Sequence, residues 1–238
     1  MDPNNPTPLS PSPALAGAAT DSGVAPFLRA VYGWMCVGLG ITAVTAYAVA
    51  SSPAMLSAIA TNRVLFWALI IAQFGLVIVL SARVQKLTPA VASLLFLLYS
   101  GLTGVTFAFV LLAYTGQSVA NVFVVTAGMF GALALYGTTT KRDLTGLGQF
   151  AMMGVVGVVL ASIIGIFWQN DTFQFVLSVI GVVAFTALTA WDANRLRALA
   201  LALPEGGAGS YAIVGALSLY LDFINLFLFL LRLFGRRR

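Results

Sequence analysis

Seven apolar stretches follow one another along the chain, separated by short polar breaks. They lie near residues 28–50, 64–82, 89–113, 118–136, 148–168, 172–193 and 211–232. At 1.5 Å per residue, about 20 helical residues cross a hydrocarbon layer of about 30 Å, so each stretch is long enough to span a membrane. Residues 94–114 (LLFLLYSGLTGVTFAFVLLAY) show no alternation of polar and apolar positions, which the strands of a membrane β-barrel would require. The pattern predicts an all-α integral membrane protein with seven transmembrane helices.

Composition agrees with this interpretation and removes several others. Hydrophobic residues make up 60% of the chain and charged residues only 8%, against roughly 25% in soluble domains. The first 25 residues are rich in Pro, Ala and Ser, so we expect a disordered tail at 1–25 and a membrane domain at 26–238. The net charge of +5 does not indicate a nucleic-acid partner, because the basic residues lie in short clusters between apolar stretches.

These basic clusters predict the orientation in the membrane. They contain Arg83 and Lys86, then Lys141 and Arg142, then Arg195 and Arg197. The alternate connections at 114–117 and 169–171 contain no Lys or Arg, and the one at 51–63 contains only Arg63. Because basic loops stay in the cytoplasm, the N-terminus should be cytoplasmic. Seven crossings then place the C-terminal arginines outside, against the rule; the alternative is a last segment that re-enters without crossing. We expect seven crossings.

Two aspartates are the candidate functional residues. Of the seven acidic residues, only Asp192 and Asp222 belong to apolar stretches. Asp222 lies about 16 Å into the last stretch, where a charge costs about 2.5–3.5 kcal/mol, so it must be protonated, paired or in contact with water. Intramembrane carboxyl groups usually mark ion or proton pathways. The structural alternative is a buried hydrogen bond that locks the bundle, and Asp192 could instead be an interfacial residue at a helix end.

Three segments resemble the Bax inhibitor-1 family of membrane proteins, and the overall character is closer to its bacterial members. They are the run Ala216–Phe227 (ALSLYLDFINLF), the loop Lys141–Leu144 (KRDL) and the surroundings of Asp192. The resemblance extends from about residue 28 to 235. It implies six helices around a central seventh, in a multi-pass protein of a bacterial inner membrane.

The resemblance also implies a function and its residues. It points to a pH-sensitive calcium leak governed by an aspartate pair, whose positions are occupied here by Asp192 and Asp222. An arginine at the end of the second helix latches the closed state in the family, and Arg83 matches it. The sequence departs from the family's bacterial example here, since Arg83-Val84-Gln85-Lys86 replaces a run of consecutive basic residues.

The chemistry of two carboxyl groups fits this function. At hydrogen-bond distance both cannot easily ionise, so such a pair shares one proton. Deprotonated, their oxygens suit Ca²⁺, although two carboxylates alone make a weak site that favours passage over storage. No bound cofactor is expected; the partners expected are the bilayer, protons and Ca²⁺ as the permeant ion. One difficulty is depth, because counting places Asp192 near the membrane surface and Asp222 near its middle.

Other functions are predicted less strongly. An intramembrane aspartyl protease would show a GxGD motif, but Leu219-Tyr220-Leu221 precedes Asp222. Histidine is absent, which excludes a Ser–His protease, so we do not expect an enzyme. The main alternative is a regulatory or scaffold protein that binds other membrane proteins, acting in cell-death regulation or on a membrane protease without transport. A transporter of another substrate is a further alternative.

Overall fold

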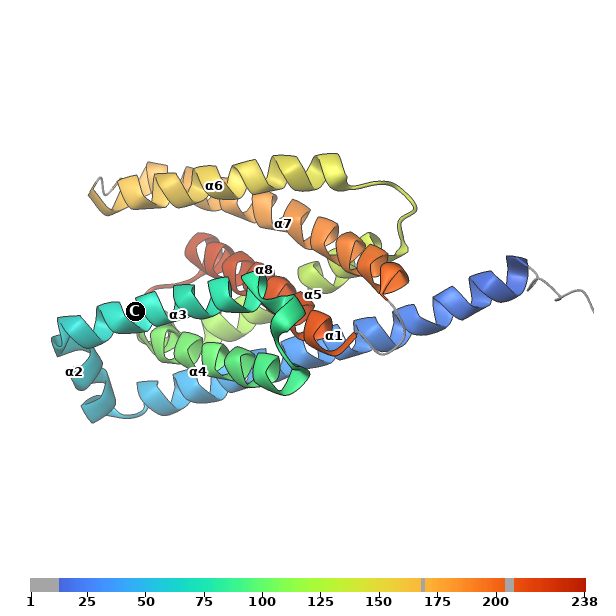
Figure 1. The fold of residues 1–238 in the computed structure, drawn as a ribbon. Helices are drawn as coiled ribbons and strands as arrows, with labels where there is room; N and C mark the ends of the chain where they lie inside the picture. Colours follow the sequence, from blue (N-terminus) through green and yellow to red (C-terminus); the bar gives the residue numbers. More distant parts are fainter. Residues whose placement is uncertain (1–12, 168–169, 204–207) are drawn as a thin grey trace, which may run out of the picture.

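The chain folds as an all-α bundle. The computed structural model describes residues 13–167, 170–203 and 208–238. In these ranges the helices are α1 (Pro13–Ala50), α2 (Pro53–Thr61), α3 (Arg63–Ala82), a 3-10 turn η1 (Val84–Lys86), α4 (Pro89–Ala113), α5 (Gly116–Thr139), α6 (Thr145–Phe167), α7 (Asp171–Ala202) and α8 (Ala208–Phe234) (Figure 1). All except α2 and η1 contain a segment long and apolar enough to cross a membrane. The predicted seven-span fold class is confirmed.

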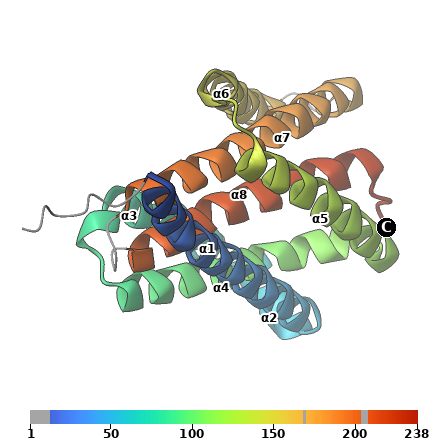
Figure 2. The ribbon, with the colours of Figure 1, turned by 90° about the vertical axis from the view of Figure 1, so that its right-hand side faces the viewer.

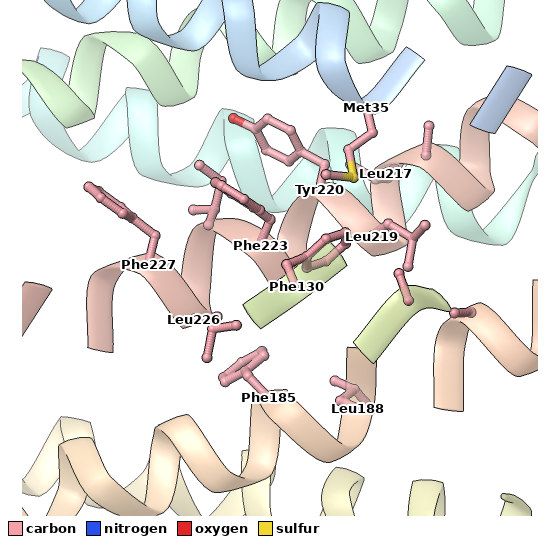
Figure 3. Packing of buried hydrophobic residues seen from close by; sticks show 14 of the residues in the cluster. Met35, Phe130, Phe185, Leu188, Leu217, Leu219, Tyr220, Phe223, Leu226 and Phe227 are labelled. Carbon is pink, nitrogen blue, oxygen red and sulfur yellow. The ribbon is translucent and has the colours of Figure 1, made fainter. Parts of the chain in front are cut away.

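Helix α8 is the centre of the bundle. In an apolar 18-residue segment of its span 72% of residues are buried, against at most 44% in the corresponding segment of any other span. It packs against α1, α4, α5 and α7, and more lightly against α3 (Figure 2). Its side chains Tyr220, Phe223 and Phe227 meet residues such as Phe130 of α5 and Met35 of α1 in one apolar core (Figure 3). Helix α6 packs against the face of α7 that points away from α8.

Helices α4 and α8 run in the same direction through the bundle. At their first turns, the Ser210 hydroxyl donates to the Leu87 carbonyl at 2.6 Å. At their last turns, the Arg238 N–H donates to the Ala113 carbonyl at 3.0 Å. Helix α8 therefore traverses the same thickness as α4, as seven crossings require. We call the end with connections 83–88 and 140–144 the inner end, and the end with the C-terminus the outer end.

Three boundaries differ from the sequence-based expectation. Helix α7 continues to Ala202 rather than ending near residue 193, because residues 194–202 (NRLRALALA) are good helix formers with no Gly or Pro. The connection at 51–63 contains the short helix α2, which begins with Ser52 as N-cap and Pro53 in its first turn. Of the expected tail, residues 1–12 lie outside the described residues, whereas residues 13–25 form the first turns of α1.

Asp143 stabilises the start of α6. Its Oδ1 accepts hydrogen bonds from the Thr145 hydroxyl at 2.6 Å and from the Thr145 N–H at 2.8 Å. The Thr145 side chain, followed by its backbone N–H, lowers the pKa of Asp143 below its ordinary value. Because this pKa is lower in the folded protein, the Asp143 carboxylate contributes fully to stability above the unfolded pKa of about 3.9. This contribution to stability is lost as the pH falls through the folded pKa.

We expect Asp143→Ala to unfold at a lower temperature than the wild type at pH 7, with the gap closing as the pH drops below about 4. Thermal unfolding of both proteins in detergent between pH 7 and 3 measures this gap. A difference in unfolding temperature of equal size at pH 7 and at pH 3 would show that the charge of the Asp143 carboxylate does not contribute to stability.

Candidate functional site: an aspartate pair below a cavity

Asp192 of α7 and Asp222 of α8 lie together inside the bundle. A side-chain hydrogen bond links the two carboxyl groups. Asp192 is 9% exposed and Asp222 only 2%. Asp222 Oδ2 receives no hydrogen bond from an N–H or O–H of the described residues. Two ionised carboxyl groups in contact would repel each other, and a proton shared between them would supply the missing donor.

The extended helix α7 resolves the difference in depth. Ten residues separate Asp192 from the last residue of α7, which corresponds to about 15 Å of helix. Asp222 lies about 21 Å along α8 from Ala208, which starts at the same end of the bundle. Both carboxyl groups are therefore well inside the bundle, at depths that allow contact.

A cavity of about 560 Å³ reaches the pair from the inner end. It is lined by residues from the end of α3, the last turns of α7 and the first turns of α8, among them Ser81, Val84, Asp192, Arg195, Tyr211 and Ser218. Asp192 belongs to this lining and Asp222 does not. The arrangement gives one carboxyl group access to the cavity and places the other directly behind it.

Arg195 is the arginine that acts on the pair in this structure. It follows Asp192 by one turn of α7, attracts its carboxyl group electrostatically and lines the same cavity. Its guanidinium lies 5.5 Å from the centre of the Trp191 ring, a cation–π contact. In the sequence, Arg195 indicated only the orientation in the membrane. Because Arg195 follows Asp192 by three residues, the two side chains share one face of a helix, and this spacing could have identified Arg195 as a partner of Asp192.

Arg83 is not joined to the pair in this structure. Its backbone ends α3 by donating to the Val79 carbonyl, and its side chain is exposed. Within the described ranges no hydrogen bond or ion pair connects Arg83 to Asp192 or Asp222. Ser81 and Val84, on either side of it in sequence, line the cavity. Arg83 therefore lies beside the cavity, and its gating role stays a prediction.

Close helix packing fixes the position of Asp192. Gly137 of α5 lies so near the backbone of Ala190 that an added Cβ would overlap the Ala190 carbonyl oxygen. Gly148 of α6 receives the Trp191 ring in the same way. The Asn194 side-chain amide donates to the Gly137 carbonyl at 3.0 Å. Residues next to Asp192 on both sides are therefore clamped between α5 and α6.

Toward the outer end, aromatic packing closes the seam between α7 and α8. Phe229 lies against Gly181, where an added Cβ would be 2.7 Å from the ring. The Phe229 ring stacks on Phe185 with centroids 5.8 Å apart. Beyond it, Arg232 lies over Phe229 and donates to the Gln174 side chain at 3.3 Å. We call Phe185, Phe229 and Arg232 the outer seal.

The metal-binding capacity of the pair is limited. In the part of the chain that the structure describes, no third His, Cys, Asp or Glu joins the two carboxyl groups in a cluster able to hold an ion. Ca²⁺ usually takes six to eight oxygen ligands, so water and carbonyl groups would have to supply the rest. Such a site releases an ion as readily as it binds one.

The fold and site define a multi-pass helical membrane protein with a pair of carboxyl groups inside its bundle. Residues 24–238 match the family model described as "Inhibitor of apoptosis-promoting Bax1", and the chain belongs to this Bax inhibitor family. It is 48% identical to Inner membrane protein YbhL of Escherichia coli over 220 residues, which cover 91% of this chain and 94% of that protein. An uncharacterized membrane protein of Streptococcus pyogenes is 35% identical over 219 residues, covering 91% of this chain and 95% of its own.

Proposed function

We propose that the protein is a pH-modulated cation leak channel, with Ca²⁺ as the permeant ion and the Asp192–Asp222 pair as its gate. The observation that carries this proposal is the contact between two buried carboxyl groups, of which one lines a cavity open at the inner end. We place the protein in a bacterial inner membrane with its N-terminus in the cytoplasm. The basic connections at the inner end support this orientation, and the name of the Escherichia coli relative supports the membrane.

Protons and cations compete for the same oxygens in this mechanism. With one proton shared, the pair is less negative and holds its hydrogen bond. When that proton leaves, the carboxylates offer hard oxygen ligands to a cation that enters through the cavity. Arg195 faces Asp192 from the same helix and partly balances its charge. The number of protons on the pair therefore controls whether an ion occupies the site.

A purely structural role for the pair is less well supported. The bundle has another buried polar link close by, in which the Tyr220 hydroxyl and the Thr42 hydroxyl lie 2.6 Å apart. Thr42 also donates within the bundle to backbone carbonyls of α1 and α4, including Ser100 at 3.0 Å. This link ties α8 to α1 and α4 without any ionisable carboxyl group. Burying two carboxyl groups has a desolvation cost, and a purely structural contact does not need ionisable groups.

Passage to the outer side requires the outer seal to open. Phe229 fills the space over Gly181, and Arg232 lies over the Phe229 ring. A hydrated ion beyond Asp222 would meet these rings. Movement of the Phe229 ring away from α7 is therefore part of the conducting state that we propose.

Calcium flux in liposomes tests the proposal. Full-length protein is reconstituted with a calcium dye inside, and the initial flux is recorded across a pH series for wild type, Asp192→Asn and Asp171→Asn. We expect a pH-dependent flux in the wild type that becomes independent of pH in Asp192→Asn, because the pair can no longer exchange its proton with the cavity. Asp171 lies exposed at the start of α7, so Asp171→Asn should retain the wild-type profile.

Two outcomes would contradict the proposal. One is a wild-type flux no greater than that of protein-free liposomes, which would favour the regulatory alternative. The other is an unchanged pH profile in Asp192→Asn, which would remove the pair from the gate.

A further inference from the structure

A second cavity lies at the outer end, between the start of α5 and the end of α8. Its volume is about 670 Å³. Its lining has a polar part, which includes Gln117, Asn121 and Arg236, and an apolar part, which includes Val125, Leu230 and Phe234; α5 and the C-terminal segment of the chain contribute to both parts. Among the described residues that line it, Arg236 alone is charged. The aspartate pair contributes nothing to this cavity, which we call the outer groove.

The C-terminal backbone holds Arg236 at the groove. The Arg236 N–H donates to the Ser118 hydroxyl at 2.8 Å, and the Arg236 carbonyl accepts from the Thr115 N–H at 3.1 Å. Arg237 pairs with Tyr114 as an antiparallel bridge. Gly235 allows the close approach, since an added Cβ would lie 2.7 Å from the Tyr114 ring. The Arg236 backbone is thus held at the groove through both its N–H and its carbonyl group.

Positive charge at the outer end is not balanced within the protein. Arg232, Arg236, Arg237 and Arg238 all lie there, and in the described ranges none of them forms an ion pair. Among the described residues, the acidic side chain at this end is that of Asp171. An excess of arginine at a membrane surface attracts anionic headgroups, and a guanidinium matches the oxygens of a phosphate.

The apolar part of the groove selects the kind of anion. Phe234 is 69% exposed and Val125 56%, so this apolar part continues onto the lipid-facing surface. A small inorganic anion would occupy the polar part and leave these side chains uncovered. A phospholipid satisfies both parts, with phosphate at Arg236, its headgroup near Gln117 and Asn121, and acyl chains over Val125 and Phe234. We propose that the outer groove binds one anionic phospholipid, such as phosphatidylglycerol, from the outer leaflet.

Lipid titration of the purified full chain tests this assignment. Native mass spectrometry measures binding of phosphatidylglycerol and of phosphatidylcholine with the same acyl chains to wild type, Arg236→Gln and Arg237→Gln. Both variants remove one charge from the same tail, but only Arg236 lines the groove. Both keep the backbone hydrogen bonds of the tail. We expect phosphatidylglycerol to bind about tenfold more weakly to Arg236→Gln, from loss of a charge-assisted hydrogen bond, and normally to Arg237→Gln.

The remaining outcomes would overturn the assignment. Equal losses in the two variants would mean diffuse attraction to the arginine cluster instead of a site. Equal binding of phosphatidylcholine by the wild type would remove the role of the anion. Full displacement of phosphatidylglycerol by millimolar inorganic phosphate would identify a small-anion site. Thermal unfolding of each variant without added lipid checks that the fold is intact.

Discussion

Asp222→Asn is expected to reduce calcium flux at least about tenfold at the pH where the wild-type flux is highest, because the wild-type pair has then lost its shared proton. The amide fits the same space but carries no negative charge behind Asp192. Two unit charges 4 Å apart interact by about 4 kcal/mol at an effective dielectric constant of 20, so even a third of that energy changes ion occupancy by about tenfold. The flux assay in liposomes, with Asp171→Asn as a matched control, measures the loss.

The same variant should fold normally, which separates loss of the site from loss of the protein. The asparagine N–H can donate to the Asp192 carboxylate and so replace the shared proton. We therefore expect the thermal unfolding midpoint of Asp222→Asn to stay within a few degrees of the wild type. Wild-type flux from a folded Asp222→Asn protein would refute the gate, because a structural lock would tolerate the amide and a conducting carboxylate would not.

Gly137→Ala is expected to destabilise the bundle by about 1–3 kcal/mol, the usual cost of forcing atoms into a packed core. The new methyl group would overlap the Ala190 carbonyl oxygen and lie 3.0 Å from the Ala193 Cβ. Both contacts are with the turn of α7 that carries Asp192, so α7 must move away from α5. Thermal unfolding in detergent measures the change in stability.

Gly131→Ala supplies the control for this experiment. Gly131 lies on the same helix α5, and a Cβ there would meet nothing within 4 Å. Alanine is the better helix former by up to about 1 kcal/mol, so this variant should be as stable as the wild type or more so. If the two variants unfolded at the same temperature, the α5–α7 contact would not be the tight packing described above.

The sequence predicted the helices better than it predicted the site. Apolar stretches of spanning length identify membrane helices directly, because lipid leaves the backbone no other partner than itself. Because Arg195 and Arg197 are charged, the sequence predicted a loop where the end of α7 lies. In the fold, Arg195 faces the cavity and the Arg197 guanidinium donates to the Thr140 carbonyl at 3.3 Å, so the helix continues through them.

The contact between Asp192 and Asp222 depended on that longer helix. With α7 ending near residue 193, the two carboxyl groups seemed to lie at different depths; with α7 ending at Ala202, they meet. The cavity and the pairing of the C-terminal tail with the turn after α4 involve residues far apart in sequence. No local pattern encodes such contacts. These contacts are determined by how the helices pack against one another.

The central position of α8 has a consequence for biosynthesis. Chains emerge from the ribosome N-terminus first, so the helix that every neighbour needs is the last to be made. Until then, helices α1, α4, α5 and α7 lack the surface against which their inner faces pack. Completion of the bundle must therefore wait until α8 has been translated, and a nascent chain stopped before residue 208 would lack the central helix.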